Sequence, residues 1–206
     1  MSSFNPIRDP KQDALITPEN SALVVIDYQP VQVNSVESMH RSDLVKNICI
    51  LCRLAVDFKL PVILSTVNVK TGVNKETVGP VAEILQGIPS YDRTAINAWE
   101  DKEFYEAVIA TGRKKLVMAA LWTEACLSFP ALDAIREGFD VFPVVDAVGG
   151  TSLSAHETAL RRMENAGAQL TSISQLACEL QRDWNRKETV PFFVNALVAN
   201  GSFLKL

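Results

Sequence analysis

The 206 residues of the chain suit one domain with a substantial hydrophobic core. Hydrophobic residues make up 48% of the chain and charged residues 21%, which is ordinary for a soluble globular protein. The mild net charge of −4 argues against broad binding to nucleic acid or to anionic membranes, so we expect neither partner. The chain lacks a membrane-length apolar stretch and a signal-peptide pattern, which predicts a cytoplasmic protein with reduced cysteines.

The chain divides into a polar arm at residues 1–20, a domain at 21–185 and an apolar tail at 186–206. Within the domain, strand patterns alternate with helix patterns. The expected strands lie at residues 22–26, 61–67, 90–95, 115–121, 139–145 and 168–173. The expected helices lie at residues 39–59, 80–86, 102–111, 125–138, 154–166 and 174–185.

This alternation predicts an α/β fold, a doubly wound and mostly parallel six-stranded sheet with helices on both faces. In the common strand order 3-2-1-4-5-6, strands 1 and 4 are neighbours, and ligands bind outside their carboxyl ends. Strand 1 ends in Asp27, strand 3 carries Arg93, and strand 4 ends shortly before Cys126. No glycine-rich phosphate loop follows strand 1, so we expect no dinucleotide and no other cofactor.

Cys126 stands at the first turn of a predicted helix, where free backbone N–H groups and the helix dipole favour the nucleophilic thiolate. Asp27 is placed to accept the thiol proton, and Arg93 to hold that carboxylate. Each residue also has a simpler interpretation. Cys126 would be a small buried hydrophobe, Asp27 would cap a turn, and Arg93 would pair with Asp92 or another surface carboxylate.

The other cysteines and the two histidines point to no metal or redox site. Cys49 and Cys52 form a CxxC, but they lie in a predicted helix with the apolar spacing of a core-facing surface. Cys178 lies on another helix face, and we expect all three to be packing residues. His40 and His156 are the only histidines and are far apart in sequence, so we predict no catalytic metal.

Two segments carry a family resemblance. Residues 23–29 are an apolar strand ending in Asp-Tyr-Gln, and residues 121–126 read Leu-Trp-Thr-Glu-Ala-Cys. They resemble the D-x-Q and G-x-x-T-[DE]-x-C motifs of the isochorismatase-like cysteine hydrolase superfamily, although Leu121 stands where relatives usually have glycine. Further stretches, among them residues 136–141 and 166–170, are similar to the YcaC-like hydrolases of unknown specificity. The resemblance covers about residues 20–185.

The resemblance implies a catalytic triad of Asp27, Arg93 and Cys126. Arg93 stands where most of the superfamily has lysine, and because arginine stays protonated it supplies charge but cannot shuttle a proton. Proton transfer then falls mainly on Asp27. The resemblance also implies a cis peptide bond between Leu121 and Trp122, and an oxyanion hole formed by the backbone N–H groups of Trp122 and Cys126.

The activity that follows is that of a cysteine hydrolase, which cleaves a C–N bond of a small amide-like substrate through a thioester. Two alternatives remain, namely ether hydrolysis of the isochorismatase type and a non-catalytic or redox-sensing oligomer with a vestigial triad. Loops determine specificity in such folds, and we expect Gln29, Asn97 and Trp99 to line the substrate pocket.

The expected partners are a small-molecule substrate and further copies of the chain. The resemblance implies a homo-oligomer, with an octamer of two stacked rings as the best single number. The apolar tail follows the last expected helix, so the core does not need it, and an apolar patch of that kind marks an interface. Phe192, Phe193 and Leu197 are the expected anchors on a neighbouring subunit, with Trp184 nearby.

Overall fold

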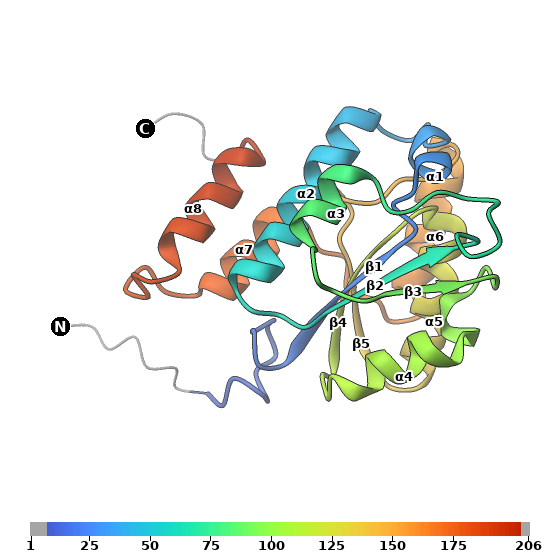
Figure 1. The fold of residues 1–206 in the computed structure, drawn as a ribbon. Coiled ribbons are helices and arrows are strands. Elements are labelled where there is room, and N and C mark those ends of the chain that lie inside the picture. Colours follow the sequence, from blue (N-terminus) through green and yellow to red (C-terminus); the bar gives the residue numbers. More distant parts are fainter. Residues whose placement is uncertain (1–7, 203–206) are drawn as a thin grey trace.

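A parallel sheet organises the chain (Figure 1). The computed structural model describes residues 8–202. The five strands of the sheet lie in the order β3-β2-β1-β4-β5, which confirms the predicted class and the central place of β1 beside β4. The strands are β1 (Ser21–Ile26), β2 (Val62–Val67), β3 (Ser90–Arg93), β4 (Lys115–Ala120) and β5 (Asp140–Pro143). All residues of β1 and β4 are buried, as expected of strands covered on both faces.

The predicted sixth strand, at residues 168–173, is reduced to a single bridge between Val144 and Thr171. Thr171 still exchanges backbone hydrogen bonds with the chain after β5, at 2.9 and 3.0 Å. The next residue, Ser172, already caps a helix by accepting a hydrogen bond from the backbone N–H of Gln175. The helix therefore begins before a sixth strand can extend, and the sheet has five strands.

The helices form two layers, one on each face of the sheet (Figure 1). Helices α2, α3 and α7 pack together on one face, and α4, α5 and α6 cover the other. The helices are α1 (Pro30–Asn34), α2 (Arg41–Asp57), α3 (Gly79–Ile84), α4 (Lys102–Ala110), α5 (Ser128–Arg136), α6 (Leu153–Asn165), α7 (Ile173–Gln181) and α8 (Val190–Ala199). Among residues 8–202, none of these helices is long and apolar enough to cross a membrane.

Two short turns and two unpredicted helices refine the expected pattern. Helix α1 lies in a segment expected to be a loop, and α8 lies in the expected tail. The helix predicted at 125–138 begins instead with a π-helical turn, η2 (Thr123–Leu127), and continues as α5. A 3-10 turn, η1 (Ala98–Glu100), precedes α4, which Asp101 caps by accepting from the N–H of Phe104.

The described part of the N-terminal arm, residues 8–20, is not a free polar segment. Ile16 is fully buried, and its backbone N–H donates to Oε2 of Glu179 at 2.6 Å. Lys115 of β4 donates to the backbone carbonyl of Ala14 at 3.0 Å. Buried apolar and polar contacts therefore tie residues 8–20 of the arm to the domain. Residues 1–7 lie outside the described part of the chain.

Helix α8 belongs to the core of its own chain. It packs against α2 and α7, and it stands at the far side of this layer from the sheet (Figure 1). Phe193 and Leu197 are buried there, and the ring of Trp184 meets that of Phe193 edge-on at 5.2 Å. The prediction that Phe193 and Leu197 anchor a neighbouring subunit is therefore wrong. The opposite side of the helix carries Val198, which is 56% exposed.

Replacing Phe193 with alanine should destabilise the protein by about 3–5 kcal/mol, because it removes a buried aromatic ring between helices and leaves a cavity. The free energy of unfolding, measured by urea denaturation, checks this expectation. Asn195→Ala, on the exposed side of the same helix, is the control and should change the stability little. Equal stability of the Phe193→Ala variant and the unmodified protein would show that α8 is dispensable for the core.

Candidate active site

The three residues that the sequence singled out come from three strand ends. Asp27 follows β1, Arg93 is the last residue of β3, and Cys126 lies in η2, shortly after β4. Parallel strands present their carboxyl ends at one edge of the sheet, so these segments converge there. Asp27 is fully buried, Arg93 is 3% exposed and Cys126 is 8% exposed. The structure thus brings the predicted carboxylate, cation and thiol together.

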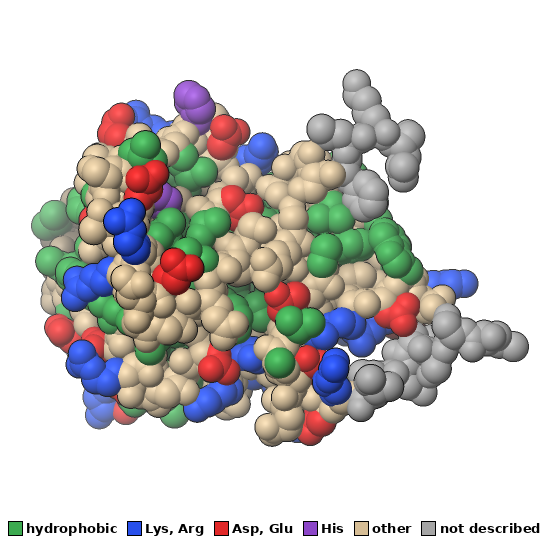
Figure 2. Space-filling view, turned by 180° about the vertical axis from the view of Figure 1, so that it is seen from behind, with side chains coloured by type: hydrophobic (Ala, Val, Ile, Leu, Met, Phe, Trp, Pro, Cys, Tyr) green, Lys and Arg blue, Asp and Glu red, His purple; other side chains and the backbone are tan. Residues whose placement is uncertain are grey.

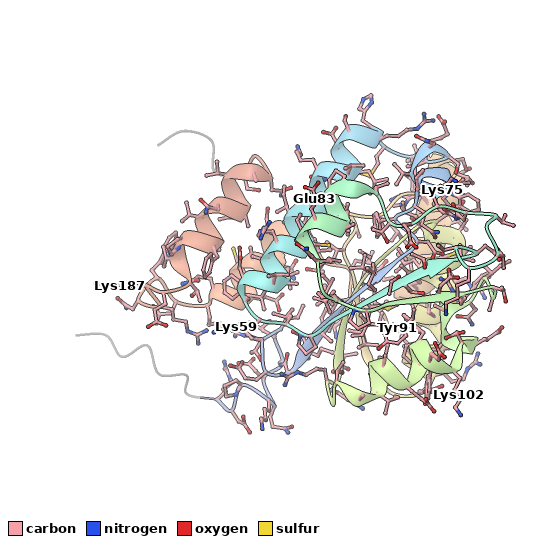
Figure 3. All side chains as sticks on the ribbon, viewed as in Figure 1. Lys59, Lys75, Glu83, Tyr91, Lys102 and Lys187 are labelled. Atoms are coloured by element: carbon pink, nitrogen blue, oxygen red, sulfur yellow. The ribbon has the colours of Figure 1, made fainter. Side chains whose placement is uncertain are left out.

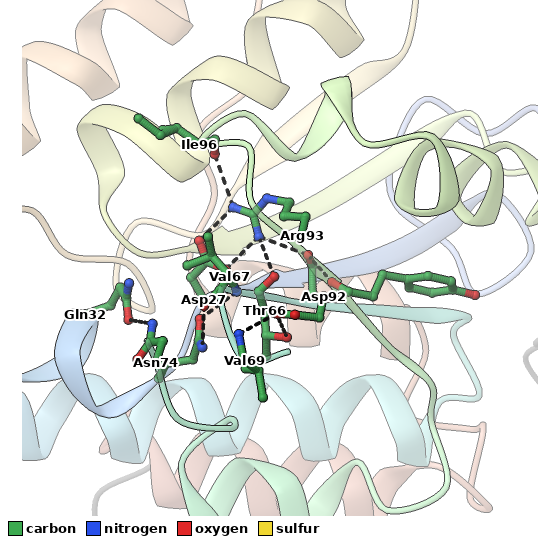
Figure 4. Close-up of polar contacts among 12 residues, drawn as sticks. Asp27, Gln32, Thr66, Val67, Val69, Asn74, Asp92, Arg93 and Ile96 are labelled. Atoms are coloured by element: carbon green, nitrogen blue, oxygen red, sulfur yellow. Dashed lines mark hydrogen bonds and ion pairs between the residues drawn. The ribbon is translucent and has the colours of Figure 1, made fainter. Parts of the chain in front are cut away.

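A two-pronged ion pair joins Asp27 to Arg93 (Figure 4). Nη1 of Arg93 donates to Oδ1 of Asp27 at 2.8 Å, and Nη2 donates to Oδ2 at 2.8 Å. The simpler interpretation, in which Arg93 pairs with Asp92, does not hold. Asp92 instead accepts hydrogen bonds from the loop after β2, including the N–H of Val69 at 3.0 Å. Arg93 therefore pairs with the buried carboxylate of Asp27 and not with a surface carboxylate.

Three further acceptors fix the guanidinium of Arg93. They are Oγ of Ser65 and the backbone carbonyls of Thr66 and Ile96, each at 3.1 Å. Burial lowers the pKa of Arg93, but the hydrogen bonds and negative charge of Asp27 outweigh it, so the net pKa lies above its usual range. Sequence reasoning did not single out Ser65. The sequence signal that could have identified it is the pair of hydroxyl residues, Ser65 and Thr66, inside the otherwise apolar strand β2.

The backbone at Asp27 turns sharply as β1 ends. Its φ angle is +62°, in the left-handed region that aspartate tolerates better than most residues. The backbone N–H of Asp27 still pairs with the carbonyl of Ser65 in β2, at 3.0 Å. The turn thus keeps one bond to the sheet while it directs the carboxylate toward Arg93. An uncommon backbone conformation of this kind is often found at functional sites.

The surroundings of Cys126 favour its neutral thiol. Burial first, and then the nearby carboxylate of Asp27, raise the pKa of this thiol to about 12. The positive charge of Arg93 and the backbone N–H of Trp122 act in the opposite direction but do not prevail. The expectation that the start of a helix favours a thiolate at Cys126 is thus opposed by burial and by the charge of Asp27. Loss of hydration outweighs the helix dipole, which acts only over one turn.

The segment before the cysteine has a special geometry. The peptide bond between Leu121 and Trp122 is cis, at the position where the family resemblance places one. The backbone N–H of Trp122 acts to lower the pKa of the Cys126 thiol. The indole of Trp122 donates to Oγ of Ser35 at 3.2 Å and so is tied to the segment after α1. The role of the Trp122 and Cys126 amides as an oxyanion hole stays a prediction.

The three expected pocket residues have their polar groups engaged elsewhere. Gln29 is fully buried. Its side-chain Nε2 donates to the backbone carbonyl of Val67, and its Oε1 accepts from the backbone N–H of Val67. Asn97 caps η1 and donates to Asp133 at 2.7 Å. Trp99 packs edge-on against Phe139 and neighbouring rings, away from the strand ends. Contact of these residues with substrate stays a prediction, while their observed role is to hold loops.

The remaining candidate ligands do not form a metal centre. Within residues 8–202, no group of three or more His, Cys, Asp or Glu side chains is placed to hold a metal ion. Both oxygens of Asp27 accept from Arg93, and Nδ1 of His156 bonds to the Thr123 hydroxyl at 2.8 Å. Cys52 is buried as expected, whereas Cys178 is exposed, which corrects its assignment as a packing residue.

A cavity of about 1250 Å³ lies away from these residues, at the opposite edge of the sheet. Its lining includes Lys59, from the turn before β2, and Lys187, from the segment before α8. Figure 3 shows both lysines on the α8 side of the molecule, whereas Lys75, in the loop after β2, lies at the other side. Acidic and basic side chains both line the cavity, and none of Asp27, Arg93 and Cys126 belongs to its lining, so it is separate from the candidate site.

Comparison with known proteins shows the family of the chain. Residues 21–175 match the isochorismatase domain family. The probable hydrolase YcaC of Escherichia coli (strain K12) is 40% identical over 166 residues, which span 80% of this chain and 79% of that protein. The structure of YcaC from Pseudomonas aeruginosa, with hexane-2,5-diol and covalent acrylamide, has a TM-score of 0.85 and 34% identity over 91% of this chain and 92% of that one. Escherichia coli YcaC, an octameric hydrolase of unknown specificity, also has a TM-score of 0.85, with 36% identity over 92% of each chain.

Replacing Asp27 with asparagine should lower the pKa of Cys126, because both the charge and the hydrogen bond of Asp27 raise it. The rate of iodoacetamide alkylation at Cys126, followed by mass spectrometry from pH 6 to 10, should increase at each pH by about tenfold or more. Arg93→Gln is the opposing variant, since it removes the charge that lowers this pKa, and its alkylation should be slower. Identical pH profiles in both variants would contradict the electrostatic account.

Proposed function

Because the chain belongs to the isochorismatase family, we propose that it is a cysteine hydrolase that cleaves the C–N bond of a small amide-like substrate. The observation that carries the proposal is the placement of a buried thiol beside a carboxylate that an arginine fork holds in position. Such a trio supplies a nucleophile, a base and a fixed countercharge. Cys126, Asp27 and Arg93 take these roles in that order.

The reaction begins from the neutral thiol. As the Cys126 sulfur attacks the substrate carbonyl carbon, its proton passes to the Asp27 carboxylate, whose charge already acts on the thiol. The C–S bond forms while the carbonyl π electrons move to oxygen. The backbone N–H groups of Trp122 and Cys126 stabilise that oxyanion, in the role that the family resemblance assigns to them. The thiolate therefore exists only while it reacts.

Collapse of the tetrahedral intermediate breaks the C–N bond. Asp27 returns its proton to the departing nitrogen, so that a neutral amine or ammonia leaves and a thioester remains on Cys126. Asp27 then removes a proton from a water molecule that attacks the thioester, and the proton finally returns to the sulfur as the acid product departs. The same carboxylate acts as base and acid in turn, and no cofactor enters the cycle.

Arg93 balances charge through this cycle and does not transfer protons. In the resting site its guanidinium faces the ionised Asp27. When the proton moves from Cys126 to Asp27, the negative charge moves to the reacting sulfur and oxygen atoms, which Arg93 still attracts. A cation that attracts the negative charge both on Asp27 and on the reacting atoms reduces the free-energy cost of moving that charge inside a buried site.

A relative supports the presence of a reactive nucleophile. YcaC from Pseudomonas aeruginosa was determined with covalent acrylamide, which reacts with nucleophiles at its carbon–carbon double bond. The substrate proposed here is small because Cys126 is only 8% exposed. A redox-sensing role fits less well, since sensor thiols have a low pKa and are accessible. Ether hydrolysis does not use a thiol nucleophile, and no contact in the site favours it.

We also propose that the chain works as a homo-octamer. The octameric state of YcaC from Escherichia coli, 36% identical over 92% of this chain, supports this number. Helix α8 is apolar around most of its circumference, and hydrophobic side chains gather at the surface on its side of the molecule (Figure 2). A helix of that composition is normally covered on both sides. The cytoplasm, where thiols stay reduced, is the proposed location.

Cys126→Ala should reduce turnover of small primary amides by more than about a thousandfold, because no other thiol lies beside Asp27. Ammonia release from a panel of aliphatic, aromatic and ureido substrates measures this loss. Cys178→Ala is the matched control and should keep full activity, since Cys178 is exposed on α7. Near-normal turnover by the Cys126→Ala variant would exclude the thioester route.

Light scattering should give a mass eight times that of the chain. Val198→Glu should shift the mass toward smaller species, because the new charge lies on the exposed apolar side of α8. Val73→Glu, in an exposed loop remote from α8, is the control and should leave the mass unchanged. A monomeric mass for the unmodified protein would reject the octamer, and an unchanged mass for Val198→Glu would place the contact elsewhere.

A further inference from the structure

The turn η2, which carries Cys126, packs against helix α6. Thr123, the first residue of η2, is fully buried, and its hydroxyl lies 2.8 Å from Nδ1 of His156. His156 lies in the first turns of α6, and its backbone N–H bonds to the carbonyl of the capping residue Ser152 at 3.0 Å. The imidazole is therefore fixed at the start of a helix and reaches back to the nucleophile turn.

A second contact ties the same turn to the loop before α6. Oε1 of Glu124 accepts from the N–H of Thr151 at 2.9 Å and from its hydroxyl at 2.6 Å. The backbone N–H of Thr123 donates to the carbonyl of Gly149 at 3.0 Å. Thus two successive residues of η2 are bonded to the segment that leads into α6.

Gly150 shows how closely these segments approach. A Cβ atom at this position would lie 2.6 Å from Oε2 of Glu124 and 3.0 Å from Cβ of His156. A contact of 2.6 Å essentially never occurs in folded proteins, so a side chain at this position would displace the carboxylate of Glu124 from its bond to Thr151. The loop, the first turns of α6 and η2 therefore form one tightly packed unit with little freedom to rotate.

We propose that His156, acting through the Thr123 hydroxyl, is a positioning residue that fixes the turn η2 and with it the orientation of the Cys126 sulfur. Thr123 follows Trp122 directly and stands three residues before Cys126, so a rotation at Thr123 displaces both residues. The inference deepens the proposed function, because it names what orients the nucleophile. The catalytic importance of this positioning rests on the proposed function, whereas the contacts themselves are observed in the structure.

The chemistry of His156 suits this role. Burial lowers its pKa, while the nearby carboxylates of Glu124 and Glu157 raise it, and the net pKa lies below the usual value. The ring is therefore neutral at neutral pH, with one nitrogen that donates and one that accepts. Thr123 has a hydroxyl that both donates and accepts, so the bond is satisfied with either tautomer. The neutral ring adds no charge beside the thiol.

The test compares His156→Leu with His156→Asn. Leucine fills the space but cannot bond to Thr123, whereas the asparagine amide occupies the position of Nδ1 and retains a hydrogen-bonding group. Alkylation of Cys126 by iodoacetamide is measured at pH 6–10 in the full-length protein, with the exposed Cys178 as an internal reference. Thermal unfolding is recorded for each variant.

With His156→Leu, alkylation of Cys126 should become about tenfold or more slower relative to Cys178, because the turn η2 loses its bond to α6 and the sulfur its fixed orientation. His156→Asn should restore most of the rate. A purely structural role predicts the opposite sign, since loosening of the fold exposes Cys126 and increases its alkylation. An unchanged or faster rate in His156→Leu therefore overturns the proposal.

Thr123→Val provides the same test from the other partner, and it applies even when His156→Leu fails to fold. Valine has the shape of threonine without its hydroxyl, so the same loss of rate is expected, and Thr123→Ser should retain the rate of the unmodified protein. Alkylation requires no substrate. Failure of the amide panel would thus reject the proposed function while the positioning role is still measured, and a normal alkylation rate in Thr123→Val would reject the positioning role alone.

Discussion

The buried ion pair between Asp27 and Arg93 is the constraint on which the candidate site depends. Its two hydrogen bonds of 2.8 Å join the ends of β1 and β3 across the intervening β2, whose Ser65 also accepts from the guanidinium. Burial of two charges is costly, and removal of one partner typically costs about 3–5 kcal/mol because the other charge remains unpaired. The carboxyl edge of the sheet is therefore held in one arrangement, and Asp27 has a single orientation from which to act on Cys126.

The same burial determines the state of the thiol. A cysteine at the start of a helix is expected to ionise readily when solvent and backbone N–H groups reach it. Here removal from water and the charge of Asp27 together raise the pKa of Cys126 to about 12. In the proposed mechanism the thiol keeps its proton until a carbonyl group is in place. Such a mechanism requires precise alignment, and the turn η2 is bonded on several sides to the segment before α6.

The chain termini show how far packing extends beyond the predicted domain. Ile16 from the arm and Phe193 from α8 both complete the hydrophobic core, and Glu179 of α7 binds the backbone of Ile16. Helix α8 thereby presents one apolar side to its own chain and another outward. The outward side is the surface on which the proposed assembly relies, so the folded core and the proposed interface share one helix.

The sequence by itself determined the α/β class, the order of the central strands and the convergence of Asp27, Arg93 and Cys126, because alternating apolar patterns and strand ends are local signals that topology rules convert into proximity. Only the tertiary structure decided which carboxylate Arg93 binds, whether Cys126 is ionised, and whether Phe193 faces its own core or a neighbour. Each of these depends on distances between segments far apart in the chain and on exclusion of water, and neither quantity is encoded in a local pattern. The bond between Thr123 and His156, 33 residues apart, was unforeseen for the same reason.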